Sequence, residues 1–119
     1  MSARLRLLAV AAGCATLAVP AAPAHALVQH QIVTVQSRFL PGDLVILEGD
    51  TLFLTNGDLA NHDVRADDTS GGLPLFRSAI VGPGGHTEVL GVSSLPASVY
   101  PFSCSVHDFM RGTLTVLAP

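Results

Sequence analysis

The sequence has little charge and no lysine. Charged residues make up 13% of its 119 residues, and all six basic residues are arginines. No apolar run approaches the 20 or so residues of a membrane-spanning helix, and no helical period holds for three turns. An apolar fraction of 49% argues against disorder, and the length leaves no room for two domains. These features predict one small globular domain that is not helical.

The first 26 residues have the pattern of a secretory signal peptide. Arg4 and Arg6 precede a 13-residue apolar run, Leu7 to Val19, and a stretch of small residues then ends at Ala26. The run is too short to cross a bilayer comfortably. We therefore expect residues 1–26 to be removed and residues 27–119 to be exported, to the periplasm or the extracellular space, without a transmembrane segment.

Two alternatives concern the processing of this segment. Residues 22–24 (Ala-Pro-Ala) form a second acceptable cleavage site, which would make His25 the first residue of the exported chain. Residues 11–14 (Ala-Ala-Gly-Cys) loosely resemble a lipobox, so anchoring of a lipoprotein at Cys14 is a minor alternative. The intact mass of the exported protein distinguishes these outcomes.

Removal of the leader changes the charge and the cysteine content. Residues 27–119 hold four arginines and nine acids, a formal net charge of −5, so we expect no nucleic-acid partner. Cys104 is the one cysteine that remains, and an internal disulfide is therefore impossible. A domain of 93 residues without a disulfide depends on its core, on a metal, or on both.

From residue 27 onward, segments of strand length alternate with clusters of Gly, Pro, Asn and Asp. The segments are Val28 to Gln36, Leu44 to Leu47, Thr51 to Thr55, His62 to Ala66, Leu75 to Ile80, His86 to Val92, Ser98 to Ser103 and Thr113 to Leu117. About eight short strands at even spacing predict an all-β domain, a Greek-key β-sandwich or a small barrel. The longest polar loop, Asp67 to Pro74, has room for one helical turn, which the sequence leaves open.

Residues with metal-binding chemistry gather near the C-terminus. Cys104, His107 and Met110 follow one another with two residues between each, and chance produces this spacing about once in 2,000. The spacing places a thiolate, an imidazole and a thioether on one turn between two strands. His62, which follows a polar loop, is the best candidate for a second imidazole. These four donors are typical of a mononuclear copper electron-transfer site, whereas zinc prefers more cysteines, or a carboxylate and a water.

Several segments resemble the cupredoxins, in particular the plastocyanin, pseudoazurin and amicyanin group. They are residues 39–41 (FLP), 48–58 (EGDTLFLTNGD), 61–64 (NHDV) and 100–112 (YPFSCSVHDFMRG), and they span nearly the whole exported chain. The resemblance implies a Greek-key β-sandwich that binds one type 1 (blue) copper ion. It also implies that the ligands are His62, Cys104, His107 and axial Met110.

The resemblance further implies a small exported protein, not an enzyme, that shuttles single electrons through Cu(I) and Cu(II). Its partners would be redox proteins such as cytochromes, or copper or haem reductases and oxidases, and the chain would be a monomer. His107 would be the electron port, in an apolar patch that includes Leu40 and Phe109. The alternative is an extracytoplasmic copper-binding, storage or delivery protein on the same fold. A multicopper oxidase is excluded because only His30 and His86 remain for a trinuclear centre.

Two residues depart from the family's pattern. Asp63 follows the first histidine where the family usually has Asn, and a carboxylate near the thiolate would favour Cu(II) and lower the reduction potential. We expect Asp63 to accept a hydrogen bond from Ser105. Val106 stands where the family often has Pro, and its N–H would raise the potential if it pointed at the Cys104 sulfur. The two effects oppose each other.

The remaining histidines and several acids are expected to have no part in this chemistry. We expect His30 and His86 to be solvated side chains without a partner at metal spacing. Glu48 and Asp50 are expected to be turn residues on either side of Gly49.

Overall fold

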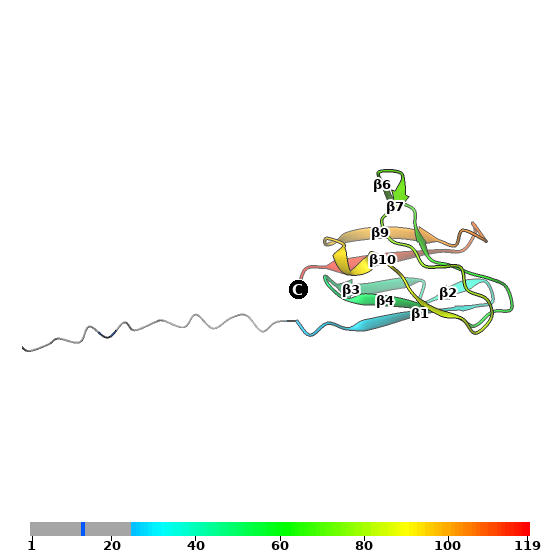
Figure 1. Ribbon diagram of the computed structural model, residues 1–119, viewed down its shortest axis with the longest axis horizontal. Coiled ribbons are helices and arrows are strands. Elements are labelled where there is room, and N and C mark those ends of the chain that lie inside the picture. The colour runs from blue at the N-terminus through cyan, green and yellow to red at the C-terminus, as the bar shows by residue number, and fades with distance from the viewer. Residues whose placement is uncertain (1–12, 14–24) are drawn as a thin grey trace, which may run out of the picture.

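Two four-stranded β-sheets lie against each other in the computed structural model, which describes Gly13 and residues 25–119 (Figure 1). The first sheet has the order β2-β1-β4-β8, formed by β1 (Gln29–Val35), β2 (Arg38–Leu40), β4 (Thr51–Asn56) and β8 (His86–Glu88). The second has the order β3-β10-β9-β5, formed by β3 (Asp43–Leu47), β5 (Arg65–Ala66), β9 (Ser98–Ser103) and β10 (Arg111–Leu117). A small hairpin of β6 (Thr69–Ser70) and β7 (Leu73–Pro74) projects from the sandwich (Figure 1).

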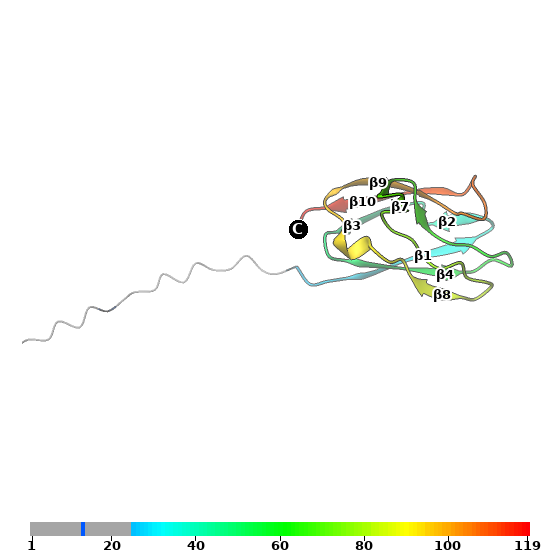
Figure 2. The same cartoon turned by 45° about the horizontal axis from the view of Figure 1, so that its top comes forward.

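The order of the strands is that of a Greek-key sandwich, as expected. β1 pairs with β4 in parallel, and β3 pairs with β10 in parallel, so each sheet joins segments that are separated in the sequence. The chain changes sheet between β2 and β3 and changes back between β3 and β4, as Figure 2 shows from a second side. The prediction of an all-β Greek-key β-sandwich is confirmed.

The core lies between the sheets and follows the two-residue period of the strands. In β4, Leu52, Leu54 and Asn56 are buried while the residues between them are partly exposed. Phe102 from the facing sheet packs edge-on against Phe39, with ring centroids 5.1 Å apart. Full burial of each large apolar side chain stabilises such a fold by about 1.5–3 kcal/mol, so this core holds the chain without a disulfide.

Residues 25–119 form ten strands instead of the expected eight: β2, β6 and β7 were not expected, and the other differences lie between residues 62 and 94. Of the expected strand from His62 to Ala66, only β5 remains, and the expected strand from Leu75 to Ile80 is reduced to isolated bridges. The regular ladder is interrupted at Val64: its carbonyl accepts from the Ser78 N–H at 2.8 Å, but its N–H donates to the Ser78 hydroxyl at 2.9 Å and not to a backbone carbonyl. The last expected strand of this region, His86 to Val92, ends at Glu88, and a 3₁₀ turn forms over Val92–Ser94.

The polar loop from Asp67 to Pro74 contains the β6–β7 hairpin, not a helical turn. Gly71 and Gly72 join its strands with φ angles of +60° and +81°. A two-residue hairpin turn with positive φ at both positions favours glycine, which has no Cβ to clash. The hairpin therefore depends on the two glycines at its tip.

The expected signal peptide lies almost wholly outside the described residues, so its removal stays a prediction. Of residues 1–26, only Gly13, His25 and Ala26 are described. Within the described part of the chain, no helix combines the length and the apolar character that crossing a membrane requires.

Asp50 closes the turn around Gly49, as expected, but its side chain is buried, which the sequence did not reveal. Its side chain accepts four hydrogen bonds, from the His25 and His30 rings, each at 2.9 Å, and from the N–H groups of Val28 and Leu47, at 3.0 and 3.1 Å. The expectation of a solvated His30 was therefore wrong. Burial favours the neutral acid, but the four hydrogen bonds, led by that from His30, outweigh it and hold the pKa of Asp50 well below its ordinary value.

We expect Asp50→Asn to lower the free energy of unfolding of residues 27–119 by about 2–3 kcal/mol at pH 7, because an amide cannot replace both carboxylate oxygens that accept from His30, Val28 and Leu47. Since the pKa of Asp50 is lower in the folded chain, its stabilisation is present above about pH 4 and is lost as the pH falls further. Urea unfolding at pH 7 and pH 3 measures this stabilisation. The difference in the free energy of unfolding between wild type and variant should be smaller at pH 3 than at pH 7. Asp43→Asn, at an exposed carboxylate of β3, is the matched control; an equal loss in both variants would contradict the assignment.

Candidate metal centre

The three predicted nitrogen and sulfur ligands meet at one end of the sandwich. The ligand atoms of His62, Cys104 and His107 all lie within 4.8 Å of one another. Cys104 Sγ is 3.8 Å from His62 Nδ1, and the centroids of the two imidazole rings are 4.9 Å apart. Within residues 25–119, no other His, Cys, Asp and Glu side chains form a group of three with this geometry.

Neighbouring strands bring Cys104, His107 and Met110 together. β9 ends at Ser103 and β10 begins at Arg111, and these two residues pair directly, so the segment between them is a tight loop. The Cys104 N–H donates to the Met110 carbonyl at 3.2 Å, and the Met110 N–H donates to the His107 carbonyl at 3.0 Å. These bonds place all three side chains on one rigid turn. We call residues 104–110 the ligand loop.

The site is closed to water on most sides. His62, Cys104 and Met110 are no more than 2% exposed, and His107 is half-buried. His107 Nδ1 is buried and has no hydrogen-bond partner among the described residues. An unpaired buried polar atom costs about 1–3 kcal/mol, and a metal ion bound at this nitrogen would satisfy it.

Asp58 orients His62, a role that the sequence did not reveal. His62 Nε2 donates to Asp58 Oδ2 at 2.7 Å, which leaves Nδ1 on the side of the Cys104 sulfur. Burial favours the neutral acid, but hydrogen bonds from the Ser37 N–H, the His62 ring and the Gln36 N–H outweigh it and lower the pKa of Asp58. Metal-binding histidines usually donate their second N–H to such a group. The one signal for it in the sequence was an acid four residues before the histidine.

Asp63 and Ser105 join the two segments that carry the candidate ligands. The Ser105 N–H donates to Asp63 Oδ1 and the Ser105 hydroxyl donates to Asp63 Oδ2, both at 2.6 Å. The expected hydrogen bond is therefore confirmed, and a second one accompanies it. Because each residue directly follows a candidate ligand, this pair of bonds holds His62 against Cys104.

Both apolar residues expected around His107 are exposed, and Phe109 lies beside it. Phe109 is 66% exposed and lies edge-on to His107, with ring centroids 5.7 Å apart, and Leu40 is 51% exposed. His86, away from the site, stacks on Phe53 and shares a hydrogen bond with Thr55 at 2.7 Å. His86 is exposed, as expected, and it belongs to no group of possible metal ligands among the described residues.

The donor set fits a copper ion. The group combines two soft sulfur donors, the Cys104 thiol and the thioether of buried Met110 on the same loop, with two imidazoles, and it contains no carboxylate. Soft sulfur donors and imidazoles suit copper, and a closed site without an open position suits electron transfer more than hydrolysis. The individual roles of His62, Cys104, His107 and Met110 as ligands stay predictions.

Comparison with known proteins gives the fold. No protein-family model matches the sequence, and no curated protein matches it. Among solved structures, an oxidised Met-to-Leu variant of amicyanin aligns with a TM-score of 0.63 and 19% identity, over 74% of this chain and 81% of that one. The Cu(I) form of a Met-to-Ala variant of amicyanin aligns with a TM-score of 0.64 and 21% identity, over 75% and 82%. At these identities the likeness establishes that the chain has the cupredoxin fold.

We expect Asp58→Asn to destabilise the copper-free protein by about 2–3 kcal/mol, because the backbone N–H groups and the His62 ring lose a charged acceptor. Chemical unfolding measures the loss. Nitrogen chemical shifts of the His62 ring should also show a proton on Nε2 in the wild type and a mixture of tautomers in the variant. Asp68→Asn, at an exposed acid, serves as the control; an unchanged tautomer in the Asp58 variant would refute the orienting role.

Proposed function

We propose that this chain, which has the fold of amicyanin, is a cupredoxin: an exported type 1 (blue) copper protein that carries single electrons between redox proteins. The observation that carries the proposal is the buried convergence of one thiol and two imidazoles at one end of the sandwich. We infer that His62, Cys104 and His107 bind the ion and that Met110 is the axial ligand. A bound copper ion supplies the one-electron couple Cu(I)/Cu(II).

The protein's part is to hold the ligands still. Asp58 fixes the ring of His62, the bonds between Asp63 and Ser105 join the two ligand segments, and the ligand loop is closed by its own backbone bonds. Ligands held in this way have little freedom to rearrange when the charge of the site changes. A small rearrangement makes electron transfer fast in both directions, as a carrier requires.

A carrier is favoured over an enzyme because the site leaves no open position. Four protein donors would fill the coordination shell of a copper ion, and His62 and Cys104 are almost completely buried, so a substrate would not reach an ion held there. We propose that electrons pass at the half-buried His107, where exposed Phe109 and Leu40 supply apolar surface. Partners of this kind would be cytochromes, or copper or haem reductases and oxidases.

The proposal includes the export of the protein and its oligomeric state. We infer that residues 1–26 direct export and are removed, and that residues 27–119 act as a monomer in the periplasm or outside the cell. The charge pattern and the apolar run of the N-terminus support this inference.

The visible spectrum tests the copper site. The copper-loaded, oxidised protein should show a band at about 600 nm from thiolate-to-Cu(II) charge transfer, because the Cys104 sulfur binds the ion. Cys104→Ser should abolish the band, and His86→Ala, at a histidine outside the site, should retain it. A colourless wild type would refute the proposal. A blue protein that takes up copper but shows no reversible one-electron couple would instead be a storage or delivery protein.

Asp63→Asn should raise the reduction potential, on the order of tens of millivolts, because it removes a negative charge beside the site. The amide can still accept from the Ser105 N–H and donate to its hydroxyl, so the bonds that join the two segments persist. A redox titration followed at the blue band measures the shift, with Asp43→Asn as the control for an exposed charge. No rise, or an equal rise in both variants, would contradict this effect of Asp63.

A further inference from the structure

A row of arginines crosses the outer face of the second sheet beside Cys104. Ser103 of β9 pairs directly with Arg65 on one side and with Arg111 on the other, and Arg65 in turn pairs with Arg77. Residues that lie directly opposite on neighbouring strands point to the same face of a sheet. Arg77, Arg65, Ser103 and Arg111 therefore form one line, which we call the arginine row.

The burial of the neighbouring residues confirms the direction of this row. The residues next in sequence to three members of the row face the core. They are Ala66, Phe76 and Phe102, and each is no more than 2% exposed. The three arginines are exposed. Three of the four arginines of residues 27–119 thus lie on one face, although those residues carry a net charge of −5.

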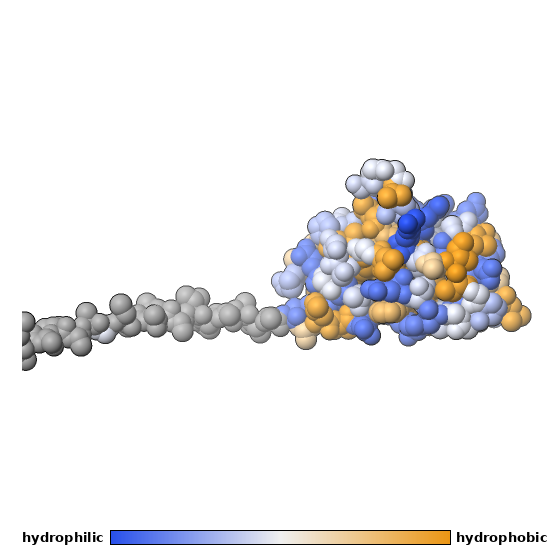
Figure 3. Space-filling view, viewed as in Figure 1, coloured by the Kyte–Doolittle hydropathy of each residue, from blue (hydrophilic) through white to orange (hydrophobic). Residues whose placement is uncertain are grey.

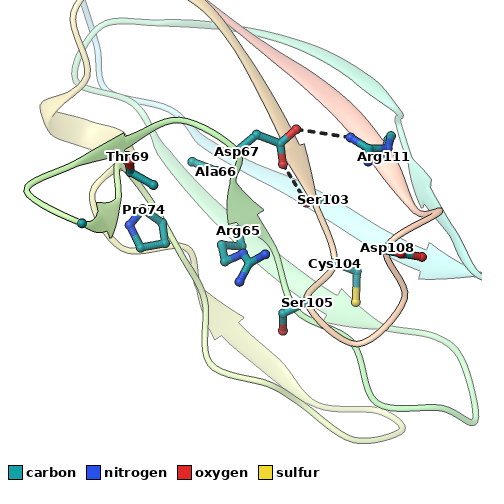
Figure 4. A pocket seen from close by; sticks show the side chains of 11 residues that line it. Arg65, Ala66, Asp67, Thr69, Pro74, Ser103, Cys104, Ser105, Asp108 and Arg111 are labelled. Carbon is teal, nitrogen blue, oxygen red and sulfur yellow. Dashed lines mark hydrogen bonds and ion pairs between the residues drawn. The ribbon is translucent and has the colours of Figure 1, made fainter.

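Part of the row lies in a groove of about 610 Å³ (Figure 4). Ser103 and Cys104 lie along its base, Thr69 and Pro74 of the β6–β7 hairpin form one wall, and Asp108 of the ligand loop lies opposite. Arg65 projects between these walls in Figure 4. Figure 3 shows a strongly hydrophilic patch at the foot of the hairpin, close to this groove.

The positive charge of the row is only partly neutralised. Asp67 accepts a hydrogen bond from the Ser103 hydroxyl at 2.7 Å and lies 3.5 Å from the Arg111 guanidinium. Within residues 25–119, no carboxylate lies within 4.0 Å of Arg65 or Arg77. Each guanidinium has five N–H donors in a planar fork that matches a carboxylate. The row can therefore bind several carboxylates at once.

We propose that the arginine row is a docking surface for an acidic patch on a redox partner protein. The inference rests on the proposed function, because Ser103, in the middle of the row, is joined by a peptide bond to Cys104, the proposed thiolate ligand. Three strand spacings of about 4.8 Å give the row a length of about 14 Å, which suits carboxylates spread over a protein surface. The surface differs from the apolar surface at Phe109 and Leu40 both in its location and in its chemistry.

The charge of the whole chain favours a protein over an anionic membrane as the occupant. A membrane presents a continuous negative surface, which would repel the acids that surround the row. An acidic patch of limited size meets only the arginines and avoids the remaining charge. The same opposition of charges would orient the two proteins before contact.

Binding is tested with a hexaglutamate peptide as the probe. Titration into the ¹⁵N-labelled exported chain at low salt should shift the amide signals of Arg65, Arg77, Ser103 and Arg111. The double variant Arg65→Glu/Arg77→Glu should weaken binding at least tenfold, and Arg65→Lys/Arg77→Lys should retain most of it. Arg38→Glu, in β2 of the other sheet, makes the same charge change as each single Arg-to-Glu substitution. It should change the affinity for the peptide less than twofold.

Electron transfer is tested with two small oxidants of opposite charge. Hexacyanoferrate(III) takes one electron from the Cu(I) protein and becomes hexacyanoferrate(II), and the protein becomes Cu(II). The double Arg-to-Glu variant should slow this reaction several-fold and should not slow oxidation by the cationic tris(phenanthroline)cobalt(III). Arg38→Glu should leave the ratio of the two rates within twofold of wild type.

The outcomes separate this inference from the proposed function. The docking surface would be overturned if the peptide shifted only amide signals around His107, or if Arg38→Glu weakened peptide binding as much as the double variant did. A blue, redox-active protein would still support the proposed function. A colourless protein that still bound the peptide through the row would refute the function and leave only an acid-binding surface. Binding to phosphatidylglycerol vesicles that depends on the row, without any response to hexaglutamate, would show that the occupant is a membrane and would overturn the proposal.

Discussion

The two hydrogen bonds between Asp63 and Ser105 join the halves of the candidate metal centre. The halves are separated by 42 positions in the sequence, and each of the two bonds is 2.6 Å long. Because His62 directly precedes Asp63 and Cys104 directly precedes Ser105, this contact holds the imidazole and the thiol toward each other, together with the bond from His62 to Asp58. The sandwich brings the segments near each other, and the carboxylate sets their distance. A rigid meeting of this kind is what a one-electron carrier needs.

Carboxylates organise histidines at both ends of β4: Asp50 is buried and Asp58 is partly buried. Asp50, just before the strand, accepts from His25 and His30, and Asp58, just after it, accepts from His62. Both acids keep a low pKa because hydrogen bonds outweigh the cost of burial. At the first end the result is a tie between the N-terminal segment and the sheet. At the second end the same chemistry orients a candidate metal ligand.

Two surfaces lead from the candidate centre to the outside. One is the half-buried edge of His107 with Phe109 beside it, and the other is the arginine row next to Cys104. The first is apolar and the second is positively charged, so they suit partners of different chemistry. The two surfaces lie apart because they adjoin different parts of the ligand loop. Cys104, at its start, lies beside the arginine row, and His107, in its middle, lies at the end of the sandwich.

The sequence by itself determined what depends on neighbours along the chain: the all-β class, the bounds of β9, and the grouping of Cys104, His107 and Met110. Strand alternation and a short loop act over a few residues, so their pattern is legible without a structure. Only the tertiary structure decided that Asp58 and Asp50 anchor histidines and that three arginines line up across β10, β9, β5 and the bridge at Arg77. It also reduced the expected strand at Leu75 to Ile80 to bridges, where the Val64 N–H bonds the Ser78 hydroxyl and not a backbone carbonyl. These outcomes depend on the register between distant strands and on burial, which local spacing does not encode.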